Sequence, residues 1–187
     1  MIKVYFDGAC WPRSPGGHIG WGFFVWERRN KQQYQDYGYG PPGRTTCNLA
    51  EYWAAHEAVV YLLRQGLERK RIIIYGDSKL VVKQMNGKWK IHEGVYESVA
   101  RTTYELVQQF EQLKFQWVPR ANNSYADYLS RLGLQKGGVI CHAIDPRIKD
   151  LVADPNTPAF RKRFSQCLNQ LQSSQTLKES SNLKTNV

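Results

Sequence analysis

Four acidic residues of this chain lie where chemistry on a phosphodiester could use them. Asp7 and Asp77 each end an apolar segment that predicts a buried strand, and Glu51 opens a long amphipathic segment. Asp127 follows a short polar segment beyond the last predicted strand. Charged groups beside buried strands are costly unless they are paired or bind a metal ion. Because hard cations prefer oxygen ligands, we expect these four side chains to converge on a metal site.

The elements that must position these acids follow from the hydrophobic pattern. We expect strands at residues 2–10, 20–26, 33–39, 71–77 and 114–118, with a polar hairpin turn at residues 28–31. We expect a helix that Thr46 or Asn48 caps and that ends near residue 65, and further helices at residues 78–86, 95–113 and 125–132. The long helix is predicted to bury residues that recur every three or four positions, namely Leu49, Trp53, His56, Val60 and Leu63. This order implies a mixed α/β sheet with helices on its faces.

Composition limits the classes of function that this chain fits. With 187 residues, 42% of them apolar, the chain is long enough for one folded domain and a short extension. Its formal net charge of +10 favours a polyanionic partner, either nucleic acid or an acidic membrane face. No apolar run is long enough to span a bilayer, no signal peptide precedes the first strand, and the four cysteines form no C-x-x-C pair. We therefore expect a cytoplasmic protein with reduced thiols and no membrane association.

The sequence around each acid is more specific than the acid itself. The motifs are Asp7-Gly8-Ala9-Cys10, Thr45-Thr46-Cys47-Asn48-Leu49-Ala50-Glu51, Gly76-Asp77-Ser78-Lys79 and Asn123-Ser124-Tyr125-Ala126-Asp127. With the order of elements, these motifs resemble the type 1 ribonuclease H family over residues 1–134. The resemblance implies a ribonuclease H-like fold, an α/β fold in which three antiparallel and two parallel strands form a five-stranded mixed sheet flanked by helices.

The resemblance also implies an activity. The protein would be an endonuclease that hydrolyses the RNA strand of an RNA–DNA hybrid with two Mg²⁺ ions, or Mn²⁺ as a substitute, leaving 5′-phosphate and 3′-hydroxyl ends. Asp7 would bridge both ions, and Glu51 and Asp77 would hold one of them. Asp127 would hold the other ion. General chemistry agrees, because clustered carboxylates repel one another without cations and paired metal ions can activate water and stabilise a leaving oxygen.

Seven residues are predicted to contact the substrate: Cys10, Thr46, Asn48, Lys79, Trp89, Arg120 and Asn123. RNA would be distinguished from DNA by its 2′-hydroxyls in the wide, shallow minor groove. Cys10, Asn48 and Lys79 match family contacts to the backbone or minor groove, and Thr46 matches a contact to a DNA phosphate. Thr46 and Asn48 are equally plausible as helix caps without any such role. Trp89 lies between two lysines, where it would either contact the substrate or pack on the protein.

Two departures from the common pattern resemble a compact, archaeal-like subgroup of the family. The segment before the last helix is too short for the mobile histidine loop of many bacterial members, and Arg120 stands in its place. The basic, tryptophan-rich handle that grips the hybrid in some members is reduced to Asn86-Gly87-Lys88-Trp89-Lys90. The guanidinium of Arg120 would hold the scissile or departing phosphate, or it would only pair with a surface acid.

The chain divides into three predicted regions. Residues 1–135 form the ribonuclease H-like catalytic domain, residues 136–172 form a basic C-terminal extension with a predicted helix, and residues 173–187 form a disordered tail. The cluster Arg161-Lys162-Arg163 lies on the predicted helix at residues 159–172. This cluster would add nucleic-acid or protein contacts, or it would only be a solvated face. We expect the protein to be a monomer.

Three other functions stay open from the sequence. A hybrid-binding module that does not cut would be expected to lack one of the carboxylates, and all four are present. A transposase or a Holliday-junction resolvase would share carboxylates on strands but would not be expected to share the block from Thr45 to Glu51. The third option is a domain of a reverse transcriptase, against which the initiating Met1 directly before the first strand argues mildly.

Overall fold

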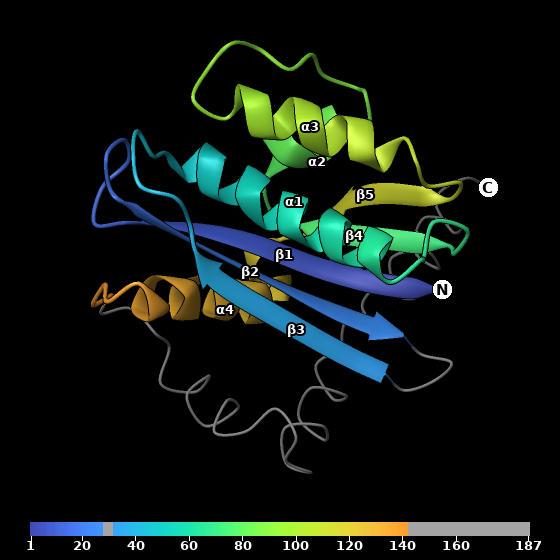
Figure 1. Cartoon of the computed structure of the whole chain (residues 1–187), viewed down its shortest axis with the longest axis horizontal. Coiled ribbons are helices and arrows are strands. Elements are labelled where there is room, and N and C mark those ends of the chain that lie inside the picture. The colour runs from blue at the N-terminus through green and yellow to red at the C-terminus, as the bar shows by residue number, and fades with distance from the viewer. Residues whose placement is uncertain (28–31, 142–187) are drawn as a thin grey trace, which may run out of the picture. The chain divides into compact units, whose positions relative to one another are not determined.

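The computed structural model describes residues 1–27 and 32–141 (Figure 1). The hairpin turn predicted at residues 28–31 and the helix predicted at residues 159–172 lie outside the described residues. The same holds for most of the predicted extension and for the whole predicted tail. All eleven residues predicted for metal or substrate binding lie within the described part of the chain.

The order of strands and helices is the one that the hydrophobic pattern predicts. The strands are β1 (Ile2–Trp11), β2 (His18–Glu27), β3 (Gln32–Tyr39), β4 (Ile72–Gly76) and β5 (Leu113–Trp117). The helices are α1 (Cys47–Arg64), α2 (Lys79–Met85), α3 (Glu97–Val107) and α4 (Ser124–Lys136), with a 3-10 turn at Arg120–Asn122 before α4. Helices α1, α2 and α3 lie on one face of the sheet, and α4 lies on the other (Figure 1).

The five strands form one mixed sheet in the order β3-β2-β1-β4-β5, which confirms the predicted fold class. Strand β2 pairs antiparallel with β1 and β3, whereas β4 pairs parallel with β1 and β5. Every residue of β4 is buried, as its run of β-branched residues predicts for a strand covered on both faces. The parallel pairing of β1 with β4 ends at Tyr5 and Tyr75. Residues just beyond this pair lie at the carboxyl end of the parallel strands, where α/β sheets commonly bind ligands.

Helix α1 buries a different stripe from the predicted one. Of the predicted residues only Leu49 is buried, whereas the other four are half-buried. The fully buried positions are mostly small residues: Ala50, Tyr52, Ala54, Ala55, Ala58, Val59 and Leu62. Because α1 packs against both the sheet and α3, small side chains occupy the inner face where the backbones approach closely, and the larger predicted residues lie at its flanks.

The predicted ends of two helices were wrong. Helix α3 ends at Val107, where the turn bond from the Phe110 amide to the Val107 carbonyl replaces the helical pattern, and Phe110 remains buried. The apolar spacing that predicted a helix to residue 113 therefore comes from a turn and the start of β5. Helix α4 continues to Lys136, with Leu134 buried against the sheet side of the domain. Within residues 1–27 and 32–141, no helix combines the length and apolar character needed to cross a membrane.

Two glycines let α1 and α4 approach the sheet on either side of Asp7. A Cβ atom added at Gly8 would lie 2.3 Å from the amide nitrogen of Glu51. A Cβ atom at Gly22, which pairs with Asp7 in the sheet register, would lie 2.4 Å from the Cβ atom of Leu129 in α4. Because neither position has room for a side chain, the backbones of both helices pack directly on the sheet beside Asp7.

Replacing Gly8 with alanine tests this close packing. Gly8→Ala should lower the free energy of unfolding by about 1–3 kcal/mol, the usual cost of overpacking, because the methyl group must displace α1 from β1. Gly94→Ala is the matched control, since its methyl group would lie an ordinary 3.4 Å from the Tyr96 ring. Urea unfolding of both variants and the wild type measures the difference. Equal unfolding midpoints for the two variants would contradict the direct contact of α1 with β1.

Candidate active site

Three of the four predicted acids come together at the carboxyl end of the parallel strands. Asp7 lies inside β1 rather than at its end, because the strand continues to Trp11, but it lies two residues past the last parallel pair with β4. Asp77 directly follows β4, and Glu51 projects from the second turn of α1. One carboxylate oxygen from each of these three residues lies within 4.8 Å of the others. The sequence prediction of converging acids therefore holds for these three side chains.

Burial and nearby negative charge disfavour the charged forms of Asp7 and Glu51. The side chain of Asp7 is buried, and burial raises its pKa well above the usual range, with a further rise from the charges of Asp127 and Asp77. Burial likewise raises the pKa of Glu51, and the charges of Asp7 and Asp77 add to the effect. The Oε2 atom of Glu51 is buried and has no hydrogen-bond partner. An all-oxygen donor set with an unpartnered buried carboxylate oxygen fits a hard divalent cation such as Mg²⁺ or Mn²⁺.

Asp127 lies outside this group of three and is held by two arginines instead. Its Oδ1 atom accepts a hydrogen bond of 2.6 Å from Nη2 of Arg120. Nη2 of Arg131 lies 2.9 Å from Oδ2 and 3.2 Å from Oδ1. A hydroxyl connects Asp127 to the group, because Oγ of Ser130 lies 2.8 Å from both Oδ2 of Asp7 and the carbonyl oxygen of Asp127. That Asp127 binds a metal stays a prediction.

Ser130 and Arg131 are the site residues that the sequence reasoning missed. Both follow Asp127 on α4, by three and four positions, and residues at these spacings lie on the same face of a helix. Ser130 is fully buried, so its hydroxyl bonds to Asp7 and to the Asp127 carbonyl rather than to solvent. The helical spacing from Asp127 was the signal that could have identified them.

Two further side chains fix the backbone around the acids. Asn123 is buried, and its side-chain amide donates a 2.9 Å hydrogen bond to the carbonyl oxygen of Phe6, next to Asp7. Its own Oδ1 atom is buried without a hydrogen-bond partner. The indole Nε1 of Trp117 donates a 2.9 Å hydrogen bond to the carbonyl oxygen of Asp77. The structure thus places the predicted substrate residue Asn123 beneath the site, where it connects the start of α4 to β1.

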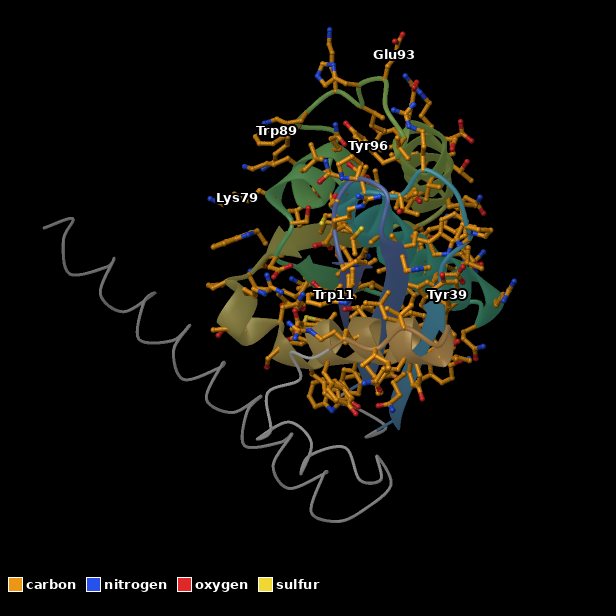
Figure 2. All side chains as sticks on the ribbon, turned by 90° about the vertical axis from the view of Figure 1, so that its left-hand side faces the viewer. Trp11, Tyr39, Lys79, Trp89, Glu93 and Tyr96 are labelled. Atoms are coloured by element: carbon orange, nitrogen blue, oxygen red, sulfur yellow. The ribbon has the colours of Figure 1, made fainter. Side chains whose placement is uncertain are left out.

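The other predicted substrate residues lie on the surface near this end of the sheet. Thr46 caps α1, since its Oγ1 accepts a 3.1 Å hydrogen bond from the Leu49 amide, and the side chain of Asn48 is exposed. Cys10 is half-buried. Lys79 and Trp89 project toward the same side of the molecule, and Trp89 is 51% exposed (Figure 2). The exposed part of Trp89 is accessible to a substrate and the rest is covered by the protein, so its contact with substrate stays a prediction.

Comparison with known proteins assigns the family. The family model described as reverse transcriptase-like matches residues 6–133. Ribonuclease H1 from the halophilic archaeon Halobacterium salinarum NRC-1 is 30% identical, with a TM-score of 0.60 over 72% of this chain and 97% of that one. The chain belongs to the reverse transcriptase-like family and carries a type 1 ribonuclease H domain. This ribonuclease H domain is also similar to LC11-RNase H1, solved in complex with RNA/DNA hybrid, at 27% identity and a TM-score of 0.65 over 74% of this chain and 100% of that chain.

Curated relatives of the ribonuclease H domain differ in length from this chain. The bifunctional protein Rv2228c of Mycobacterium tuberculosis is 31% identical over 129 residues, which are 69% of this chain and 35% of that protein. This chain therefore spans about a third of the mycobacterial protein. Ribonuclease HI of Halobacterium salinarum is 30% identical over 133 residues, which are 71% of this chain and 64% of that protein.

The raised pKa values predict how the metal-free protein responds to pH. Because Asp7 and Glu51 bind protons more tightly in the folded protein than in the unfolded chain, stability should fall as pH rises from about 4, the usual carboxylate pKa, through the raised pKa values of these two groups. Asp7→Asn should remove much of this fall, since it removes one of the crowded charges. Urea unfolding in a chelator across this pH range measures the effect.

The control for this experiment is an exposed carboxylate outside the site. Glu111→Gln is suitable, because Glu111 is exposed and only forms a 3.7 Å ion pair with Arg69. The stability of Glu111→Gln should depend on pH as that of the wild type does. Added Mg²⁺ should stabilise the wild type and Glu111→Gln more than it stabilises Asp7→Asn. If the stability of Asp7→Asn varied with pH as steeply as that of the wild type, the assignment of the raised pKa to this cluster would be wrong.

Proposed function

We propose that this protein is an endoribonuclease that hydrolyses the RNA strand of RNA–DNA hybrids with two divalent metal ions. The products would carry 5′-phosphate and 3′-hydroxyl ends. One observation carries the proposal: Asp7, Glu51 and Asp77 meet within 4.8 Å, with a buried oxygen of Glu51 left unpartnered. The similarity to LC11-RNase H1, a protein solved with an RNA/DNA hybrid, supports the choice of substrate.

The acids would divide the metal ligation among themselves. Asp7 would contact both ions, and Glu51 and Asp77 would hold one of them. Asp127 would hold the second ion from the start of α4. Mg²⁺ is the proposed ion and Mn²⁺ its substitute, and a bound pair supplies an activated water and stabilises the leaving oxygen. The protein contributes fixed ligand positions, because Ser130 orients Asp7 and Trp117 holds the backbone of Asp77.

The substrate would bind across the exposed basic residues beside the acids. Lys79 and Trp89 are exposed on the α2 side of the sheet end, and Lys88 and Lys90 flank the tryptophan (Figure 2). Their ammonium groups would bind phosphates, and the indole offers a face for stacking. Discrimination of RNA from DNA would come from 2′-hydroxyls met in the minor groove. The net charge of +10 favours such a polyanionic partner.

Asp77→Asn tests the catalytic assignment. Cleavage of a labelled RNA–DNA hybrid in Mg²⁺ should fall by at least about a hundredfold, because the neutral amide is a poor cation ligand of almost unchanged shape. Binding of the hybrid in a chelator should stay within about twofold of the wild type. The wild type should cut the hybrid but neither double-stranded RNA nor double-stranded DNA. Near-normal turnover of the variant at saturating Mg²⁺ would refute the role of Asp77 as a metal ligand.

The length of the RNA segment tests the substrate assignment. A groove that contacts several consecutive 2′-hydroxyls should cut a duplex with one ribonucleotide poorly, and cleavage should increase as the RNA segment lengthens. Duplexes of equal total length with one, two, four or eight ribonucleotides, and an all-DNA duplex as the blank, provide the series. Initial cleavage rates at one enzyme concentration give the comparison. Equal rates for all four RNA-containing duplexes would rule out recognition of a continuous hybrid.

A further inference from the structure

Two arginines hold the same carboxylate but differ in exposure. Arg131 projects from α4, four residues after Asp127, and its side chain is 22% exposed. Arg120 projects from the 3-10 turn at Arg120–Asn122, and its side chain is 72% exposed. The carboxylate between them is only 15% exposed. Arg131 is therefore part of the packed domain, whereas most of the Arg120 side chain is available to solvent.

The hydrogen bonds to Asp127 use the same oxygen twice. Oδ1 accepts from Nη2 of Arg120 at 2.6 Å and from Nη2 of Arg131 at 3.2 Å. A carboxylate oxygen has two lone pairs, so these bonds occupy both of them. Oδ2 lies 2.9 Å from Nη2 of Arg131 in the same ion pair. A cation that uses Oδ1 must therefore displace a guanidinium, and the exposed Arg120 is the one that can leave.

Arg120 also lies in the field of the other acids. The charges of Asp7 and Asp77 add to the effect of Asp127 in raising the pKa of the Arg120 guanidinium. Its positive charge in turn opposes the rise in the pKa of Asp7. In the absence of a cation, Arg120 thus supplies part of the positive charge that the acidic group requires.

We propose that Arg120 occupies the place of the second cation at Asp127 until a substrate phosphate draws it away, and that Arg131 is a positioning residue that keeps Asp127 in place when Arg120 leaves. The inference rests on the proposed function. A phosphate can bind the guanidinium through two parallel hydrogen bonds, whereas Asp127 receives a single short one from Arg120. Binding of the hybrid and binding of the second cation then favour each other, as linkage between two sites requires.

Mn²⁺ binding to the whole 187-residue chain without substrate tests the competition. Titration calorimetry should show that Arg120→Gln binds its weaker Mn²⁺ at least about fivefold more tightly than the wild type. Arg131→Gln removes an equal charge from the same carboxylate but should not tighten Mn²⁺ binding, because Asp127 loses its fixed position. An equal gain in both variants would reduce the effect to simple charge repulsion and overturn the proposal, as would no gain in Arg120→Gln.

Hybrid binding in a chelator gives a second readout that needs no cleavage. If Arg120 moves to a phosphate, Arg120→Gln should weaken binding and lower the slope of log affinity against log salt by about one. Arg101→Gln is the control, because Arg101 is also exposed and pairs with a carboxylate, that of Glu97 on α3 at 2.8 Å, and it should change neither quantity. An unchanged salt slope in Arg120→Gln would overturn the move to phosphate.

Failure of this inference can be distinguished from failure of the proposed function. Cleavage of the hybrid by the wild type in Mg²⁺ tests the function alone. If the wild type cleaves but the two glutamine variants bind Mn²⁺ equally well, the function stands and the exchange of Arg120 is wrong. Arg131→Gln should cleave more slowly than the wild type, because Asp127 loses its fixed position. Arg131→Lys keeps the charge but loses the planar fork, so it should cleave as slowly as Arg131→Gln, and a rate within about twofold of the wild type would overturn the positioning role of Arg131.

Discussion

The fold must hold three carboxylates close together at a largely buried site, although their charges repel one another. Asp7, Glu51 and Asp77 do not attract one another, and burial strengthens their repulsion. Their positions are set by the parallel pairing of β1 with β4 and by the packing of α1 on the sheet, which Gly8 allows to within direct backbone contact. The apolar core therefore imposes a proximity that the acids alone would resist. Such a group is stable only with protons or cations bound, which is why the geometry favours metal chemistry.

Neutral side chains hydrogen-bond to Asp7 itself and to the backbone at Asp77 and next to Asp7. Ser130 contacts Asp7 through a hydroxyl, and Trp117 holds the carbonyl oxygen of Asp77 through its indole. Asn123 fixes the neighbouring carbonyl of Phe6 through its amide. These bonds orient the site without neutralising it, so the negative charge remains for cations. Among the four acids, and within the described residues, positive side chains form ion pairs only with Asp127, which lies outside the group of three.

The order of elements and three converging acids could be predicted from the sequence, because apolar strands and their terminal acids leave strong local patterns. The buried face of α1 could not, since its small residues, such as Ala55 and Ala58, carry little hydrophobic signal and are selected by the close approach of β1 and α3. The partners of Asp127 also escaped prediction. They depend on the position of α4 on the sheet and on the turn that carries Arg120, both of which are set by tertiary packing.

Lys79 and Arg120 are two exposed cationic side chains that differ in how firmly they are held. The ammonium of Lys79 lies 5.1 Å from the centroid of the exposed Trp117 ring, a contact worth about 0.5–1 kcal/mol at exposed sites. Arg120 instead forms a 2.6 Å charge-assisted bond to a mostly buried carboxylate, which is stronger. A phosphate arriving at this end of the sheet therefore recruits Lys79 at little cost. The phosphate draws Arg120 away from Asp127 only when it lies close enough to replace Asp127 as the partner. The contact of Arg120 with phosphate therefore depends on correct placement of the substrate.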